Sequence, residues 1–303
     1  MLYLLICWLA VKAVLNSDKT NINTHLESPL TLNMDDHVSF RLYPDTRPHC
    51  LEIAQLHKGL VLVLDGDELI EEGAGFGCPV VKYLDESYFS TSAQSSIQRT
   101  RNGAVLTKCF NMDAISRKTV GNSSYVNEDF YSFIHKIFEI NYLRHKSFVS
   151  AFNIVMMLRK LLKINTQFVK ADPRGKIAVK YEMVTPDELQ VTVDLSKLKQ
   201  AGCEEILILN EQGSTFFREY ADSDGLALSA RTIGAWDAIA ASEASLSDSD
   251  QRITLTLYRV KEARLFRGWE QTRGRFSWAG LGYSLPPGTS WFSYLLKLTK
   301  NPG

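Results

Sequence analysis

The sequence lacks the short motifs that mark the common metal, nucleotide and hydrolase sites. Its cysteines are few and scattered, and no two have the C-x-x-C spacing of a zinc ribbon or a thioredoxin-like site. An odd, scattered set of five favours reduced, buried thiols over a disulfide framework. No G-x-S-x-G, H-E-x-x-H or EF-hand spacing occurs. We therefore expect no metal ion and no cofactor.

The chain also lacks an excess of either charge, because Lys+Arg and Asp+Glu are equal at 34 each. A neutral chain argues against nucleic acid as the partner, so any electrostatic argument has to be local. Hydrophobic residues make up 45% and charged residues 22%, which is typical of a folded globular protein. A length of 303 residues allows one large β-rich domain or two ordinary domains.

The first residues, "MLYLLICWLAVKAVLNSD", are apolar but have no basic residue before the apolar run. This pattern does not predict a secretory signal, and the run is shorter than the roughly 20 residues that span a bilayer. Residues 1–35 are therefore predicted as an apolar helix and linker, with the helix docked on protein or lying in a membrane interface. The expected location is cytoplasmic or peripheral to the membrane.

Two regions of the chain show the alternation of β-strands. Residues 36–126 contain short apolar runs at hairpin spacing, such as "LVLVLDGDELIEEG" and "PVVKYLDESYFSTS". Residues 174–300 resume the pattern, and Leu189, Val191, Val193 and Leu195 alternate there with polar residues. The segment "WDAIAASEA" favours a short helix within this second region. We expect the two regions to form one sandwich.

Residues 127–165 interrupt these β regions with a helical pattern. No Pro or Gly occurs from 130 to 164, and apolar residues recur at helical spacing. The same segment has six Lys or Arg residues, and Glu139 is its one acidic residue. A basic, aromatic-rich helical segment is typical of an element bound to an anionic membrane surface, and equally of a helix pair packed on a sandwich with a basic edge. Both interpretations stay open.

The order of strands, helices and strands predicts a mainly β fold, a large antiparallel β-sandwich or supersandwich with a helical insertion around 128–164. It excludes the βαβα alternation of nucleotide-binding folds. In architecture the chain resembles the large sandwiches of galactose-mutarotase-like and polysaccharide-lyase proteins. No catalytic motif of those families is present in the sequence, so the resemblance implies only a fold.

The glycine-rich stretch "EEGAGFGCPVVKY", residues 71–83, carries the first candidate site. Its G-x-G-x-G is followed by Pro79 and two valines, which begin a strand, so it does not predict a phosphate loop. Glycine within a strand marks a bulge or a close approach by backbone or ligand. If the preceding hairpin turns at Gly66–Asp67, Leu64 pairs with Leu69, and either Glu71 or Glu72 points inward as a candidate acid or base. Otherwise both glutamates are solvated.

Two further groups of residues suit a polar ligand. Arg47 could bind an anion and His49 could transfer protons in the proline-shaped loop "RLYPDTRPHC", although a structural Asp–Arg pair explains the same residues. Late in the chain, tryptophans interleave with arginines in "ARLFRGWEQTRGRFSW". Flat rings beside hydrogen-bonding cations suit sugar rings, although sandwich core explains them too. The predicted substrate-binding residues are Arg47, Arg267, Trp269, Arg273, Trp278 and Tyr283.

The sequence therefore predicts a carbohydrate-active or carbohydrate-binding β-sandwich, with His49, Glu71 and Glu72 as the candidate catalytic residues. If it is an enzyme, acid/base chemistry on an acidic glycan is the expected reaction. The alternative is a non-enzymatic β protein held at an anionic membrane surface by residues 1–15 and 130–164. The sequence does not decide whether the protein is an enzyme.

Overall fold

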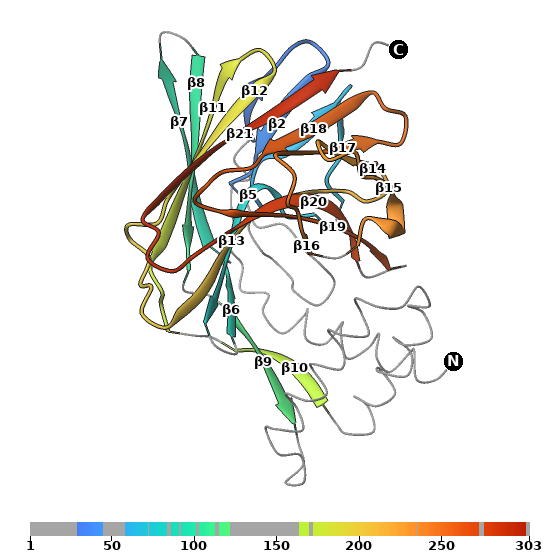
Figure 1. The fold of residues 1–303 in the computed structure, drawn as a ribbon. Helices are drawn as coiled ribbons and strands as arrows, with labels where there is room; N and C mark the ends of the chain where they lie inside the picture. The colour runs from blue at the N-terminus through green and yellow to red at the C-terminus, as the bar shows by residue number, and fades with distance from the viewer. Residues whose placement is uncertain are drawn as a thin grey trace, which may run out of the picture.

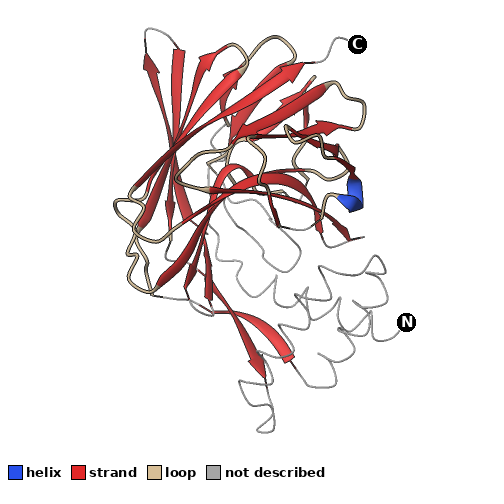
Figure 2. Ribbon diagram, viewed as in Figure 1, coloured by secondary structure: helices blue, strands red, loops and turns tan. Residues whose placement is uncertain are grey.

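A computed structural model describes residues 29–44, 58–71, 73–83, 86–90, 92–100, 103–112, 115–121, 164–169, 172–234, 236–272 and 276–300. These residues form antiparallel strands and one short 3-10 turn, η1 (Ala230–Thr232), and none of them is in an α-helix (Figure 2). The predicted helical insertion at 128–164 lies outside the described residues except for Ile164, which begins a strand. No helix in the described part of the chain is long and apolar enough to cross a membrane.

The larger sheet has nine strands (Figure 1). They lie in the order β15 (Ala227–Ser229), β14 (Phe217–Asp222), β17 (Glu243–Asp248), β18 (Ile253–Tyr258), β21 (Trp291–Lys300), β12 (Glu188–Asp194), β11 (Lys176–Thr185), β8 (Gly103–Asn111) and β7 (Ser92–Thr100). The alternation predicted around Leu189 is confirmed, since the apolar residues of β12 are buried and the polar ones are half-buried.

The second sheet has eight strands. They lie in the order β10 (Ile164–Val169), β9 (Ile115–Gly121), β6 (Glu86–Phe89), β5 (Gly75–Tyr83), β13 (Cys203–Gln212), β20 (Phe276–Leu285), β19 (Arg264–Thr272) and β16 (Asp237–Ala238). Each of the two large sheets contains strands from before residue 122 and strands from after residue 174. The domain boundaries themselves stay a prediction.

The two large sheets enclose one hydrophobic core. Tyr283 of β20 packs against Tyr294 of β21 with ring centroids 4.8 Å apart, and Ile206 and Ile208 of β13 contribute to the same core. A small sheet of β1 (Leu30–Asn33), β2 (Val38–Leu42), β3 (Val61–Leu64) and β4 (Asp67–Glu68) adds to this core. A core drawn from three sheets explains why β3 is apolar at all four positions.

The register predicted for the hairpin of β3 and β4 is wrong. The turn is the two-residue Asp65–Gly66, so Leu64 pairs with Asp67 rather than with Leu69. Both turn residues have positive φ, 52° and 92°, which is the backbone conformation whose twist matches the flanking strands. The predicted pairing of Glu71 with β3 is lost with this register.

The short helix predicted in "WDAIAASEA" is also wrong, because β16 and β17 occupy this segment. Asp237 and Ala238 pair with β19, and Ala241 and Ala244 are buried in the core. Tertiary packing overrides the local preference of alanine for helix here.

The glycine stretch forms the bulged start of β5, as the sequence predicts. The register between β5 and β13 shifts at Leu209 and Asn210, opposite Gly77. Gly77 has φ 72°, and its N–H is donated to the side-chain Oδ1 of Asn210 at 3.1 Å instead of to the strand ladder. The bulge therefore moves a backbone donor from the sheet to a side chain of the neighbouring strand.

Candidate functional site

The eight-stranded sheet has a face that is turned away from the main core, and we call it the outer face. Paired residues of antiparallel strands share a face, so the register assigns side chains to it. Its apolar residues form a separate small cluster with Ala74: Cys78, Val80, Leu209 and Phe266, with Leu207 against them. Its polar residues by the same register are Lys82, Glu205, Glu211, Arg264, Glu270 and Ser284.

Three aromatic rings form a platform on this face: Trp236, Phe266 and Trp278. The ring of Trp236 stacks on that of Trp278, with centroids 4.6 Å apart and planes at 24°. Phe266 meets Trp236 edge-on at 4.9 Å. Trp278 is 6% exposed, but Trp236 is 42% exposed, so the platform is anchored below and presents one ring to solvent. We call these three residues the aromatic platform.

Glycines beneath the rings make this arrangement possible. A Cβ atom at Gly268 would lie 2.6 Å from the indole ring of Trp278, and one at Gly282 would collide with the ring of Phe266. The rings therefore lie against bare backbone, which only glycine provides. The same strand pair carries Gly280, where a Cβ atom would lie 2.8 Å from Cγ of Glu211.

The side chain of Glu211 lies over Gly280. Gly280 pairs with Gly268, which lies beneath the ring of Trp278, so Glu211 is a neighbour of the aromatic platform on the outer face. Its side chain is 2% exposed, and its Oε2 accepts the N–H of Ala74 at 3.1 Å. Burial raises the pKa of Glu211 to about 8, with a smaller rise from Glu270, against the lowering effect of the Ala74 hydrogen bond and of Lys58. Burial therefore favours the protonated form of this carboxyl group.

Two buried lysines brace the backbone near Glu211. Nζ of Lys58 donates to the carbonyl oxygen of Glu71 at 2.7 Å, and Nζ of Lys108 donates to those of Tyr43 and Lys58 at 2.8 and 2.7 Å. Lys58 is 4% exposed and Lys108 is fully buried. Buried ammonium groups are costly unless they are paired, so the carbonyl oxygens around them fix this part of the chain.

The residues on each side of Glu211 point into the main core. Oδ1 of Asn210 accepts the O–H of Tyr294 at 2.7 Å as well as the N–H of Gly77. Nδ2 of Asn210 and both polar atoms of the Gln212 side chain are buried without a partner in the described structure. Three consecutive polar residues are thus buried at the end of β13, and such groups mark a site under functional or structural constraint.

Glu211 is not among the site residues predicted from the sequence. The available signal was the tripeptide Asn-Glu-Gln that follows the apolar run of "EEILILNEQG", because a polar triplet at the end of a buried strand is unusual. Its burial could not be read from the sequence, since the residues against it come from β5 and β20.

Only one of the predicted site glutamates is described, and it is exposed. Glu71 has φ 42°, and its carboxylate accepts the O–H of Ser277 and the N–H of Thr215 at 3.5 Å. The prediction that a glutamate of this pair points inward is therefore not met by Glu71. Glu72, His49, Arg47 and Arg273 lie outside the described residues.

The predicted stacking residues do not share one face of the sheet. Trp278 belongs to the aromatic platform, whereas Trp269 and Tyr283 are in the main core. Nε1 of Trp269 donates to the carbonyl oxygen of Ser214 at 3.3 Å. The hydroxyl of Tyr283 donates to the carbonyl oxygen of Tyr258 at 2.6 Å. Successive residues of a strand point to opposite faces. Trp269 pairs with Ala279, the neighbour of Trp278 in β20, so the two tryptophans lie on opposite faces of the sheet.

Arg267 has structural partners on the core side of β19. Its Nε donates to the carbonyl oxygen of Ile233 at 2.9 Å, and its Nη2 lies 3.6 Å from Oδ2 of Asp237. Its guanidinium lies 4.8 Å from the ring centroid of Tyr220. These contacts hold η1 and β16 against β19.

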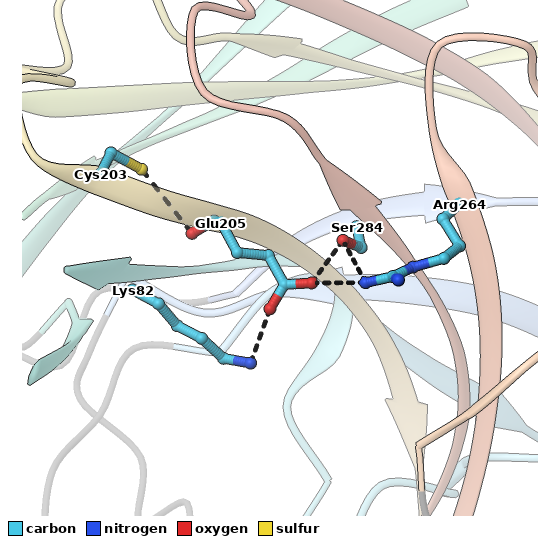
Figure 3. Close-up of polar contacts among 5 residues, drawn as sticks. All are labelled: Lys82, Cys203, Glu205, Arg264 and Ser284. Carbon is cyan, nitrogen blue, oxygen red and sulfur yellow. Dashed lines mark hydrogen bonds and ion pairs between the residues drawn. The ribbon is translucent and has the colours of Figure 1, made fainter. Parts of the chain in front are cut away.

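A polar ladder of Lys82, Glu205, Ser284 and Arg264 crosses one end of the outer face (Figure 3). Glu205 accepts from Nζ of Lys82 at 2.7 Å, from Nη2 of Arg264 at 3.1 Å and from the O–H of Ser284 at 2.5 Å. Burial raises the pKa of Glu205, but the bonds from Lys82 and Ser284 and the charges of Lys82 and Arg264 outweigh it and hold the pKa below its usual range. We keep the name polar ladder for these four residues.

Within the described residues, no group of three or more His, Cys, Asp or Glu side chains is arranged to hold a metal ion. The three described cysteines, Cys78, Cys109 and Cys203, are thiols, and Cys78 and Cys203 are buried. Burial raises the pKa of the Cys78 thiol to about 12, with Glu211 adding to the rise, so this thiol stays protonated and unreactive.

No family model and no curated protein matches this chain. Among solved structures, the chain is similar to an α-N-acetylgalactosaminidase from Bifidobacterium bifidum (TM-score 0.47, 8% identity, 90% of this chain and 36% of the other). It is also similar to a heparan sulfate lyase from Pedobacter heparinus (TM-score 0.41, 7% identity, 91% of this chain and 35% of the other). A third similar structure is a galactose mutarotase-like protein from Lactobacillus casei (TM-score 0.39, 8% identity, 90% of this chain and 100% of the other).

The chain spans about a third of the length of the first two of these proteins. The neighbours are carbohydrate-active enzymes and a mutarotase-like protein, and their likeness to this chain is one of β architecture.

Proposed function

We propose that this protein is a carbohydrate-binding β-sandwich whose glycan ligand lies on the outer face of the eight-stranded sheet. The observation that carries the proposal is the aromatic platform: Trp236 is 42% exposed and is held in a stack on Trp278. An exposed ring with a fixed orientation offers a flat apolar surface to a sugar ring and loses little side-chain entropy on binding.

The surroundings of the platform suit a sugar better than a purely apolar ligand. The polar ladder lies on the same face and offers charged donors and an acceptor to hydroxyl groups. A ligand with one apolar face and a polar rim matches this combination, and sugar rings have this character. The residues that carry the proposal are therefore Trp236, Trp278 and the ladder.

Glycan binding is tested by isothermal titration against a panel of neutral and acidic oligosaccharides. Trp236→Ala is expected to lower affinity about tenfold or more, as loss of a tryptophan at the centre of an interface does. Trp291→Ala is the matched control, because Trp291 is 53% exposed at the start of β21 in the other sheet. Equal affinities of the two variants, or no binding by the wild type across the panel, would remove the proposal.

Glu211 favours a second function, acid/base catalysis on the bound glycan. A protonated carboxyl group beside an aromatic platform is suited to donate a proton to a sugar oxygen. Glu211→Gln keeps the shape of the side chain and removes its proton-transfer capacity, so it is expected to abolish turnover and to preserve glycan binding. Glu71→Gln tests the residue that the sequence indicated. If Glu211→Gln retains full turnover, the catalytic role of Glu211 is refuted.

The alternative of a membrane-surface protein depends on residues 1–15 and 130–164, which lie outside the described part of the chain. Flotation with anionic vesicles at low salt is the direct measurement. Failure to float would exclude it.

A further inference from the structure

The polar ladder crosses four neighbouring strands in a line. Lys82 comes from β5, Glu205 from β13, Ser284 from β20 and Arg264 from β19, and Lys82–Glu205 and Arg264–Ser284 are register pairs. Figure 3 shows the side chains of Lys82 and Arg264 converging on the Glu205 carboxylate from opposite sides. The carboxylate therefore fixes the positions of two cations on this face.

The ladder carries one more positive charge than negative. Lys82 and Arg264 share the single carboxylate of Glu205. The side chain of Lys82 is 41% exposed and that of Arg264 is 67% exposed. The opposite arrangement occurs at the turn between β17 and β18 of the nine-stranded sheet, where Arg252 alone contacts both Asp248 and Asp250. An excess cation at an exposed, ordered position is attractive to an anionic group.

The ladder also has donors to spare. Arg264 contacts Glu205 and Ser284 through Nη2 alone, at 3.1 and 3.4 Å. A guanidinium has five N–H groups in a fixed plane, and those of Nε and Nη1 form no hydrogen bond with the described residues, so they remain for another acceptor. They can donate to a carboxylate or sulfate oxygen while Nη2 stays on Glu205.

The ladder and the aromatic platform are spaced for one ligand. Arg264, Phe266 and Gly268 succeed one another on the outer face of β19, and Gly268 lies beneath Trp278. Four residues of strand span about 13 Å. The apolar side chain of Phe266 lies between the two ends. A chain of a few sugar units would extend from the platform to the ladder.

We propose that the polar ladder is the subsite that recognises the anionic group, a carboxylate or a sulfate, of an acidic glycan whose neighbouring sugar stacks on Trp236. This inference rests on the proposed function and adds the class of ligand to it. Arg264 makes the direct contact with the anion, Lys82 adds positive charge, and Glu205 holds both cations in place.

The experiment compares matched ligands by titration calorimetry at low salt: oligogalacturonates and their methyl esters, and sulfated and desulfated heparin-type oligosaccharides. The wild type is expected to bind the charged member of a pair about tenfold more tightly than the neutral one, as for a hydrogen bond between charged groups. Arg264→Gln is expected to bind both members of the pair equally. Arg252→Gln, from the other sheet, is the control and keeps the preference.

A further variant separates binding from a structural role. Glu205→Gln leaves two cations with no carboxylate, so it is expected to increase the preference for the acidic ligand and the salt dependence of binding. A ladder that serves only to join strands would instead lose stability without a gain in affinity for the acid.

The possible results distinguish the two proposals. If Trp236→Ala weakens binding but the wild type binds charged and neutral ligands equally, or Arg264→Gln keeps the preference, the subsite is refuted and the glycan proposal stands. If the wild type binds neither member of any pair, the subsite is refuted as well, and the wider panel decides the glycan proposal. Loss of the preference in Arg264→Gln alone supports the subsite.

Discussion

Glu211→Gln is predicted to stabilise the protein at alkaline pH. The ordinary pKa of a glutamate is 4.5, and burial raises the pKa of Glu211 to about 8 in the folded protein. Below pH 4.5 both states hold the proton, so the group has no effect on stability. Between pH 4.5 and 8 the folded state holds one proton more than the unfolded state, so the free energy of unfolding falls as pH rises.

The slope for one proton is about 1.4 kcal/mol per pH unit, so a window of about 3.5 units gives a loss of roughly 5 kcal/mol as an upper limit by pH 8. A loss of this size is a large fraction of the stability of a typical domain. Glutamine has nearly the shape of the protonated glutamate and does not ionise, so it avoids this loss.

The assay is urea unfolding of the wild type and Glu211→Gln at half-unit steps from pH 5 to 9. The two free energies should be similar near pH 5 and should separate as pH rises, with the variant the more stable at pH 8 to 9. Glu182→Gln, on the exposed side of β11, reports the effect of removing a carboxylate elsewhere. Parallel pH profiles for wild type and Glu211→Gln would refute the buried, protonated state of Glu211.

Three further predictions test the packing of the aromatic platform, a buried hydrogen bond and an exposed ion pair. Gly268→Ala is expected to destabilise the protein by about 1–3 kcal/mol, because the added Cβ atom would lie 2.6 Å from the Trp278 ring. Urea unfolding measures the loss, and tryptophan fluorescence should change as well. An unchanged unfolding midpoint would contradict the close packing. Tyr294→Phe removes the 2.7 Å hydrogen bond to Asn210 and should lower stability by about 1 kcal/mol, measured the same way, with no effect meaning that the bond contributes nothing net. In the wild type the pKa of Asp35 is lowered to about 2, chiefly by the hydrogen bond from Lys300, and Lys300→Met removes this bond. Because both side chains are more than a third exposed, the loss of stability above pH 4 should stay under about 1 kcal/mol and vanish as the pH falls toward 2. Acid titration of the unfolding midpoint measures this difference.

Local sequence patterns predicted the elements that depend on neighbours in the chain. Leu189, Val191 and Val193 of β12 alternate into the core, and β5 begins at a glycine bulge, as the residues indicate. Where a pattern had two local solutions, the sequence was ambiguous. The hairpin turns at Asp65–Gly66, one residue earlier than predicted, because two positive φ values give the tighter turn.

The candidate site depended on contacts that the sequence does not state. β5 pairs with β13 although about 130 residues separate Phe76 from Asn210, and this pairing buries Glu211 and aligns Lys82 with Glu205. The composition already indicated a β-rich chain with late tryptophans and arginines. The register of β19 and β20 decided which of them share a face, so that Trp278 joined Trp236 while Trp269 and Tyr283 turned into the core.

The sequence by itself determined which segments alternate and where the chain must turn, because alternation and glycine act over a few residues. Only the tertiary structure decided which carboxyl group loses its water and which cations meet, because burial and charge act through neighbours brought together from distant strands.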